Sequence, residues 1–158
     1  MPINEEQMRL LRALSDVELY QQAMGFLNAE VEINRQLERR PPLPNTQIHG
    51  LLNVAQANTY SDLQDFIKHQ HSGRTWQDKN EHIKVFYKDL ERAISKLPDF
   101  AKSEGLIAEG SSVEANKKER EKISQLLACE FIQHLAAENL VRERVRMDEE
   151  KMKKEGKS

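Results

Sequence analysis

The chain has 158 residues, with 24 basic and 26 acidic side chains and a formal net charge of −2. A chain of this length forms one domain, and it contains no run of about 18 apolar residues that could span a membrane. Its single cysteine excludes an internal disulfide, and free-standing nucleic-acid-binding proteins are usually far more basic. The first residues lack the basic-then-apolar pattern of a signal peptide, so we expect a soluble, cytoplasmic protein without membrane association.

Helical signals dominate the sequence. Strand-forming residues are scarce, with seven Val, nine Ile and three Thr against 17 Leu, and no stretch alternates apolar and polar residues for long. Four pairs of residues have the spacing of a capping box, in which two side chains three residues apart satisfy backbone N–H groups at a helix start. They are Asn4 and Gln7, Ser15 and Glu18, Ser61 and Gln64, and Ser111 and Glu114. We therefore predict an all-α fold over residues 1–147, a single bundle of five or six helices with a long C-terminal helix.

The apolar periodicity places the first three helices. Apolar residues in steps of three and four predict a helix from Asn4 to Glu38, bent near Ser15. The proline cluster at residues 41–44 ends this helix, because proline lacks a backbone N–H and restricts the residue before it. Two shorter helices are predicted next, one over residues 48–55 and one that begins at Ser61 and closes at Gly73.

The second half of the chain is predicted to hold two longer helices. The first spans Trp76 to Leu97 and is stopped by Pro98, and a short helical turn leads from there to residue 110. The second begins at Ser111 and continues to about Met147. Residues 148–158 are almost wholly charged, so we expect a disordered tail there.

No motif predicts an active site. His69, His71 and His82 lie within fourteen residues, but their spacing does not place them on one helix face as zinc ligands require, so a polar loop is favoured over a metal-dependent hydrolase. Cys129 lies among apolar residues and is interpreted as a small buried side chain. No phosphate-binding glycine loop or nucleophile elbow is present. We predict a protein without catalytic activity, metal or cofactor.

Basic residues recur every four positions in the fourth predicted helix, so they form one ridge along it. The ridge consists of Lys84, Lys88, Arg92 and Lys96, and Lys68 and Arg74 lie just before it in the sequence. Cations about 6 Å apart along a helix match the repeat of a phosphate backbone. The alternative is a solvated face on which nearby carboxylates neutralise part of the charge.

Two further basic groups lie in the last helix. Arg142 and Arg146 share a face and are the second candidates for phosphate contact, although cations near a helix C-terminus also offset its dipole. The other group begins the helix and is interleaved with glutamates, as ordinary surface ion pairs are; it contains Lys117, Lys118, Arg120 and Lys122. Aromatic residues are few, so any nucleic-acid contact would be electrostatic and independent of base sequence.

The stretch from Ile48 to Val145 resembles the small subunit of a type I CRISPR effector complex (Cascade) and the helical C-terminal region of the large subunit. The features that carry the resemblance are a Leu-Leu pair on a short helix, the run Asp65-Phe66-Ile67-Lys68-His69-Gln70, the helix with the basic ridge and the long closing helix. Some small subunits are translated from an internal start in the large-subunit gene, and a chain that begins directly in a helix agrees with that origin.

The resemblance implies a non-catalytic subunit of an RNA-guided antiviral defence complex. Its partners would be the backbone and large subunits, CRISPR RNA, target DNA, and copies of itself stacked head to tail. The ridge would then contact the target or displaced DNA strand, and acidic patches such as Glu30, Glu32 and Glu38 would face basic neighbours. The alternative function is a helical protein–protein adaptor or scaffold that does not bind nucleic acid.

Overall fold

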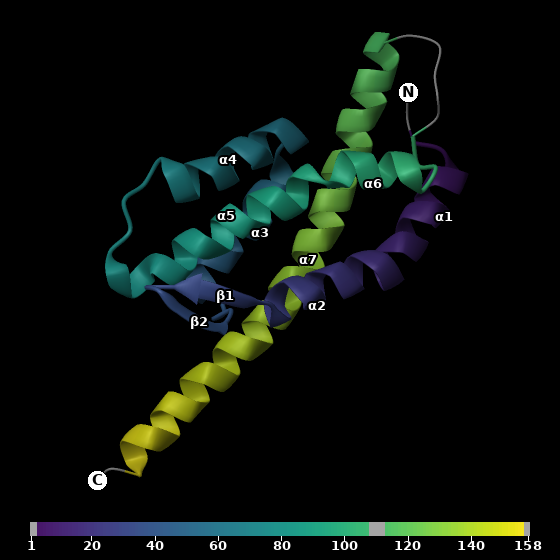
Figure 1. Cartoon of the computed structure of the whole chain (residues 1–158). Coiled ribbons are helices and arrows are strands. Elements are labelled where there is room, and N and C mark those ends of the chain that lie inside the picture. The colour runs from purple at the N-terminus through teal and green to yellow at the C-terminus, as the bar shows by residue number, and fades with distance from the viewer. Residues whose placement is uncertain (1–2, 108–112, 157–158) are drawn as a thin grey trace.

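The computed structural model describes residues 3–107 and 113–156, with side chains described from residue 117 onward in the last helix. The protein is an all-α bundle, as predicted, and its longest helix is α7 (Val113–Glu155) (Figure 1). The helices that pack most extensively along α7 are α2 (Tyr20–Asn28), α3 (Asn45–Ala57) and α6 (Leu97–Ser103). Two further helices, α4 (Tyr60–Ser72) and α5 (Glu81–Ser95), pack chiefly against each other. None of the helices in the described residues is both long enough and apolar enough to cross a bilayer.

The chain begins with a continuous helical stretch made of α1 (Glu5–Leu14), a π-helical turn η1 (Ser15–Leu19) and α2. The capping box at its start is confirmed, because Asn4 Oδ1 accepts from the Gln7 amide at 2.8 Å and Gln7 Oε1 accepts from the Asn4 amide at 3.1 Å. The second capping box is wrong. Ser15 is buried inside the helical stretch, and its hydroxyl donates to Glu130 Oε2 of α7 at 2.7 Å. At this point the helix widens into the π-helical turn and continues into α2, so no new helix starts at Ser15.

A two-stranded hairpin replaces the end of the first predicted helix. Strand β1 (Glu30–Ile33) pairs antiparallel with β2 (Gln36–Arg39), and Asn34 and Arg35 form the turn with φ values of 50° and 67°. Positive φ at both turn residues matches the twist of a tight hairpin. Val31 and Ile33 are buried against the bundle, whereas every residue of β2 is exposed. The prediction of a helix to Glu38 is therefore wrong for residues 30–38.

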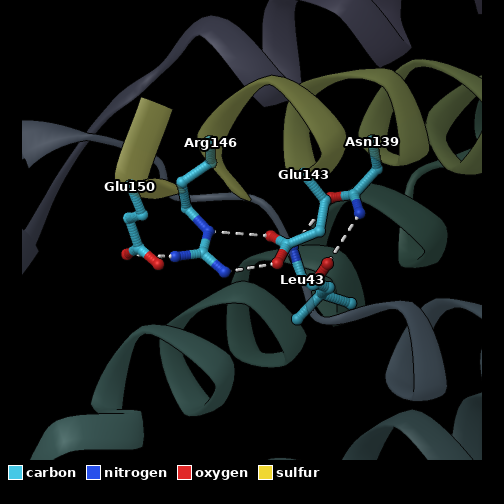
Figure 2. A network of polar contacts seen from close by, with 5 residues as sticks. All are labelled: Leu43, Asn139, Glu143, Arg146 and Glu150. Atoms are coloured by element: carbon cyan, nitrogen blue, oxygen red, sulfur yellow. Dashed lines mark hydrogen bonds and ion pairs between the residues drawn. The ribbon is translucent and has the colours of Figure 1, made fainter. Parts of the chain in front are cut away.

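The proline-rich segment after the hairpin is tied to α7 by one side chain (Figure 2). Asn139 Oδ1 accepts from the Leu43 amide, and Asn139 Nδ2 donates to the Leu43 carbonyl, both at 2.9 Å. Leu43 and Asn139 are fully buried. The neighbouring prolines have no backbone N–H and cannot form the hydrogen bonds of a regular helix or strand. The Asn139 amide therefore satisfies both the N–H and the C=O of Leu43.

Several helix ends differ from the sequence prediction. Thr59, not Ser61, caps α4, and its hydroxyl accepts from the Asp62 amide at 3.1 Å. The fourth helix was expected from Trp76, but α5 begins at Glu81 after a single 3₁₀ turn, η2 (Asp78–Asn80). Pro98 lies in the first turn of α6, where its missing N–H costs nothing. The capping box predicted at Ser111 and Glu114 lies outside the described residues.

The end of α7 also differs from the prediction. We expected disorder after Met147, but the helix continues to Glu155 with exposed side chains, beyond the end of the packed bundle (Figure 1). Pairs of opposite charge four residues apart stabilise such a helix, and Arg146 and Glu150 form one of these pairs at 2.6 Å.

Candidate nucleic-acid interface

The basic ridge lies on the solvent face of α5. The opposite face of this helix is buried and carries Ile83, Phe86, Tyr87, Leu90 and Ile94. Lys84, Lys88 and Arg92 fall between these core positions, and Lys96 is the C-cap residue of the helix. All four side chains are exposed. The sequence pattern therefore placed the ridge on the correct side of the helix.

Most of the ridge cations have no acidic partner among the described residues. Within the part of the chain that the structure describes, neither Lys84 nor Lys88 nor Lys96 forms an ion pair. Arg92 Nη1 lies 3.7 Å from Asp89 Oδ1, and the Arg92 side chain remains 68% exposed. The other oxygen of Asp89 accepts from Arg40 at 2.9 Å. The sequence left open that nearby carboxylates, those of Glu81, Asp89 and Glu91, neutralise the ridge. Among the described residues, Arg92 is the one ridge residue that pairs with any of them.

The flank of the ridge that faces the hairpin is acidic. A groove of about 810 Å³ lies between β1 and α5, and Lys88 and Arg92 form part of its wall. The carboxylates in this groove come from Glu30, Glu32, Asp78, Glu81 and Asp89. They repel a polyanion, so a nucleic-acid strand would lie along the exposed crest of α5 and not in this groove.

Lys68 and Arg74 belong to the neighbouring helix and its exit loop. Lys68 is exposed on α4, which packs along α5. Arg74 donates to Gln70 Oε1 at 3.1 Å, and its guanidinium lies 4.3 Å from the centre of the Trp76 ring. Neither contact neutralises the arginine, so its charge remains available beside the start of α5.

Arg142 and Arg146 are engaged within the protein (Figure 2 shows Arg146). Arg142 donates to Glu138 Oε1 at 3.1 Å and to Asn28 Oδ1 at 2.8 Å. Arg146 donates to both oxygens of Glu143, at 3.1 and 2.5 Å, and to Glu150 at 2.6 Å. The Glu143 side chain is only 5% exposed, so Arg146 compensates a buried charge. The structure thus gives these two arginines carboxylate partners, whereas Lys84, Lys88 and Lys96 have none among the described residues.

The candidate metal residues do not come together. His71 contacts Glu91 on α5, and His82 lies at the start of that helix. Among the described residues, no three His, Cys, Asp or Glu side chains gather where they could hold one metal ion. Cys129 is half-buried, and burial raises the pKa of its thiol.

His82 faces α7 and the hairpin. Burial is the main cause that lowers the pKa of His82, and the positive charge of Arg146 adds to it. Glu143, Glu38 and a hydrogen bond with the Lys79 backbone act in the opposite direction. The net effect is that the folded protein favours the neutral imidazole.

The lowered pKa of His82 predicts a loss of stability in mild acid. Below the ordinary pKa of 6.5 the unfolded chain binds a proton at this residue that the folded protein takes up less readily, so stability falls as the pH drops toward the lowered value. We expect His82→Gln to flatten the dependence of urea-unfolding midpoints on pH between about 7 and 5. His49→Gln, at an exposed position of α3, serves as the control and should leave it unchanged. Parallel pH profiles for wild type and His82→Gln would contradict the assignment.

Comparison with known proteins adds no relative to this picture. No family model, no curated protein and no solved structure matches the chain.

Proposed function

We propose that the chain is a non-catalytic subunit that holds a nucleic-acid strand by its phosphate backbone along the α5 ridge. The observation that carries the proposal is the set of three exposed lysines, Lys84, Lys88 and Lys96, that form no ion pair within the described residues. A lysine that already has a carboxylate partner adds little to the binding free energy when it contacts a phosphate. An unpaired lysine displaces counterions from the phosphates that it contacts, and their release favours binding. The absence of exposed aromatic rings on this crest favours contacts that do not depend on base sequence.

In its specific form, the proposal assigns the chain to a CRISPR RNA-guided surveillance complex of type I. There it would steady the target or displaced strand, contact the backbone and large subunits and the CRISPR RNA, and stack with copies of itself. The near-neutral charge of the chain is compatible with this role, because a subunit held by its neighbours needs only modest affinity for phosphate. Purification of the chain from its native host should then yield a large assembly that contains RNA. Recovery of the chain without RNA or other subunits would contradict this form of the proposal.

Charge reversal on the ridge tests the strand-binding role directly. We expect Lys88→Glu combined with Arg92→Glu to lower the affinity for an oligothymidylate by at least about tenfold at low salt, because two attractive contacts become repulsive. Fluorescence anisotropy over a salt series measures both the affinity and its salt dependence. Both side chains are exposed, so the thermal unfolding curve should change little.

A matched control separates local contacts from overall charge. Lys153→Glu combined with Lys154→Glu makes the same change in net charge on the exposed end of α7, away from α5 (Figure 1). This variant should keep most of the affinity of the wild type. Equal retention of the strand by the ridge variant and the wild type at low salt would overturn the proposed function.

A second candidate is a protein–protein adaptor, and one observation favours it. Val141, Val145 and Met152 lie on one face of the C-terminal part of α7 and are 56%, 50% and 71% exposed. Apolar residues at this spacing fit a partner helix. The same anisotropy measurement distinguishes the two functions, because an adaptor of this kind does not bind the oligonucleotide even at low salt.

A further inference from the structure

A second basic surface lies where the start of α4 meets α7. A groove of about 970 Å³ lies between the start of α4 and the first described turns of α7. Lys117, Lys118 and Lys122 line it on the α7 side, and the segment from Gln56 to Ser61 lines it on the other. All three lysines are exposed, and within the described residues none of them forms an ion pair. The sequence shows these lysines only as part of a mixed-charge helix, because the groove requires α4 and α7 to meet.

The lysines account for the charge of the groove. Two amides at the start of α4 are already paired, because the Ser61 amide donates to Glu121 Oε1 at 2.9 Å and the Asp62 amide donates to the Thr59 hydroxyl at 3.1 Å. Among the described residues that line the groove, Glu121 is the one carboxylate, and Lys117, Lys118 and Lys122 are the three cations. The Glu121 carboxylate is oriented toward the α4 backbone by the bond to Ser61. The net potential of the groove therefore attracts an anion.

Tyr60 connects the groove to the ridge. Its side chain is buried at the edge of the groove, and its hydroxyl donates to the Ile94 carbonyl at 2.7 Å. Ile94 lies two residues before Lys96, the last cation of the ridge. The C-terminal end of the ridge and the groove are thus joined by one side chain. Because only 5% of Tyr60 is exposed, its ring cannot stack on a base.

We infer that the bound strand continues past Lys96 into the groove between α4 and α7, where Lys118 and Lys122 contact further phosphates. This inference rests on the proposed function, and it extends the site from one helix face to a track across two parts of the bundle. The ligand is the phosphodiester backbone of a single strand. The ridge spans about 18 Å from Lys84 to Lys96 at 1.5 Å per residue, so a strand of only about four nucleotides occupies it without reaching the groove.

The test compares a short and a long oligothymidylate, of about four and about twelve nucleotides. With the long strand, Lys118→Gln combined with Lys122→Gln should lower the affinity about tenfold at low salt. The same variant should reduce the slope of log affinity against log salt by about 1.4, since each lost phosphate contact on a single strand contributes about 0.7. With the short strand, the variant should bind as the wild type does. Lys153→Gln combined with Lys154→Gln removes the same charge elsewhere and should change neither affinity.

The outcomes separate this inference from the proposed function. If the groove variant binds the long strand as tightly as the wild type while the ridge variant Lys88→Glu with Arg92→Glu still loses affinity, the strand does not enter the groove and the inference is wrong. Equal weakening of the short and the long strand by the groove variant would also overturn it, because the lysines would then act only through overall charge. If the ridge variant has no effect either, the proposed function itself fails.

Discussion

Asn139→Ala should lower the free energy of unfolding by about 2–3 kcal/mol, because it leaves a buried N–H and a buried C=O of Leu43 without partners. In the structure both groups are bonded to the Asn139 amide at 2.9 Å, and neither residue is exposed to water. The loss should appear as a lower urea midpoint with an unchanged slope. Among the described residues, Asn139 is the only side chain that bonds to the Leu43 backbone, so no other group takes over these bonds.

Two variants control this prediction. Gln133→Ala removes an exposed amide from the same helix, and its stability should stay within about 0.5 kcal/mol of the wild type. Asn139→Asp keeps the acceptor for the Leu43 amide but loses the donor for the Leu43 carbonyl, and it also buries a carboxyl group. We expect it to be destabilised as well. If Asn139→Ala were as stable as the Gln133 variant, the amide would contribute nothing to the attachment of the linker.

Arg40→Met should lower the free energy of unfolding by about 2–4 kcal/mol. The Arg40 side chain is 4% exposed, and its guanidinium donates to the Phe26 carbonyl and to Asp89 Oδ2, both at 2.9 Å. It also lies 4.0 Å from the centre of the Phe26 ring. Burial lowers the pKa of Arg40, and the charge and hydrogen bond of Asp89 oppose that shift. Removal of the guanidinium takes from the Phe26 carbonyl the shorter of its two hydrogen bonds. It also takes from the partly buried Asp89 carboxylate its closest cation, because Arg92 is 3.7 Å away.

The neighbouring arginine provides the control. Arg39 is exposed and donates to Asn28 Oδ1, so Arg39→Met should change stability by less than about 0.5 kcal/mol. Chemical denaturation of the two variants under one set of conditions gives the comparison. If Arg40→Met were no less stable than Arg39→Met, the attachment of α2 to α5 would depend on apolar packing alone.

The fold class could be predicted because helical periodicity is a local property. Apolar side chains at steps of three and four identify the buried face of α5, and the capping box at Asn4 identifies the start of α1. The hairpin was missed because only Glu30-Val31-Glu32-Ile33 alternates, and its turn is Asn34-Arg35 and not the usual Asn-Gly. Four alternating residues inside a helical pattern are a weak signal.

Contacts between distant residues could not be predicted at all. Ser15 looked like a helix cap because serine often satisfies the free N–H groups at a helix start, but in the structure its hydroxyl is bonded to Glu130, 115 residues away. Arg146 looked available for phosphate, but it binds Glu143, whose burial depends on the packing of α7 against the rest of the bundle. The sequence shows Glu143 three residues before Arg146, but it does not show that the Glu143 side chain is buried.

The two halves of the candidate site differ in the same way. The ridge lies on a single helix, so the spacing of Lys84, Lys88 and Arg92 was enough to predict a common exposed face. The groove is formed by α7 and by the residues before and at the start of α4, some 60 positions apart. Only the packed structure brings these segments together and shows that Lys118 and Lys122 line a groove.

The length of α7 sets how much of the molecule meets solvent. At 1.5 Å per residue, its 43 residues measure about 65 Å. This length is more than four times the radius of gyration, about 15 Å, of a compact globule of the same chain length. The accessible area is 10224 Å², against about 8200 Å² for a typical monomer of the same mass. The particle should therefore tumble anisotropically, faster about the long axis than end over end. The surplus area, about 2000 Å², is comparable to what two partners with interfaces of ordinary size would together cover on this chain.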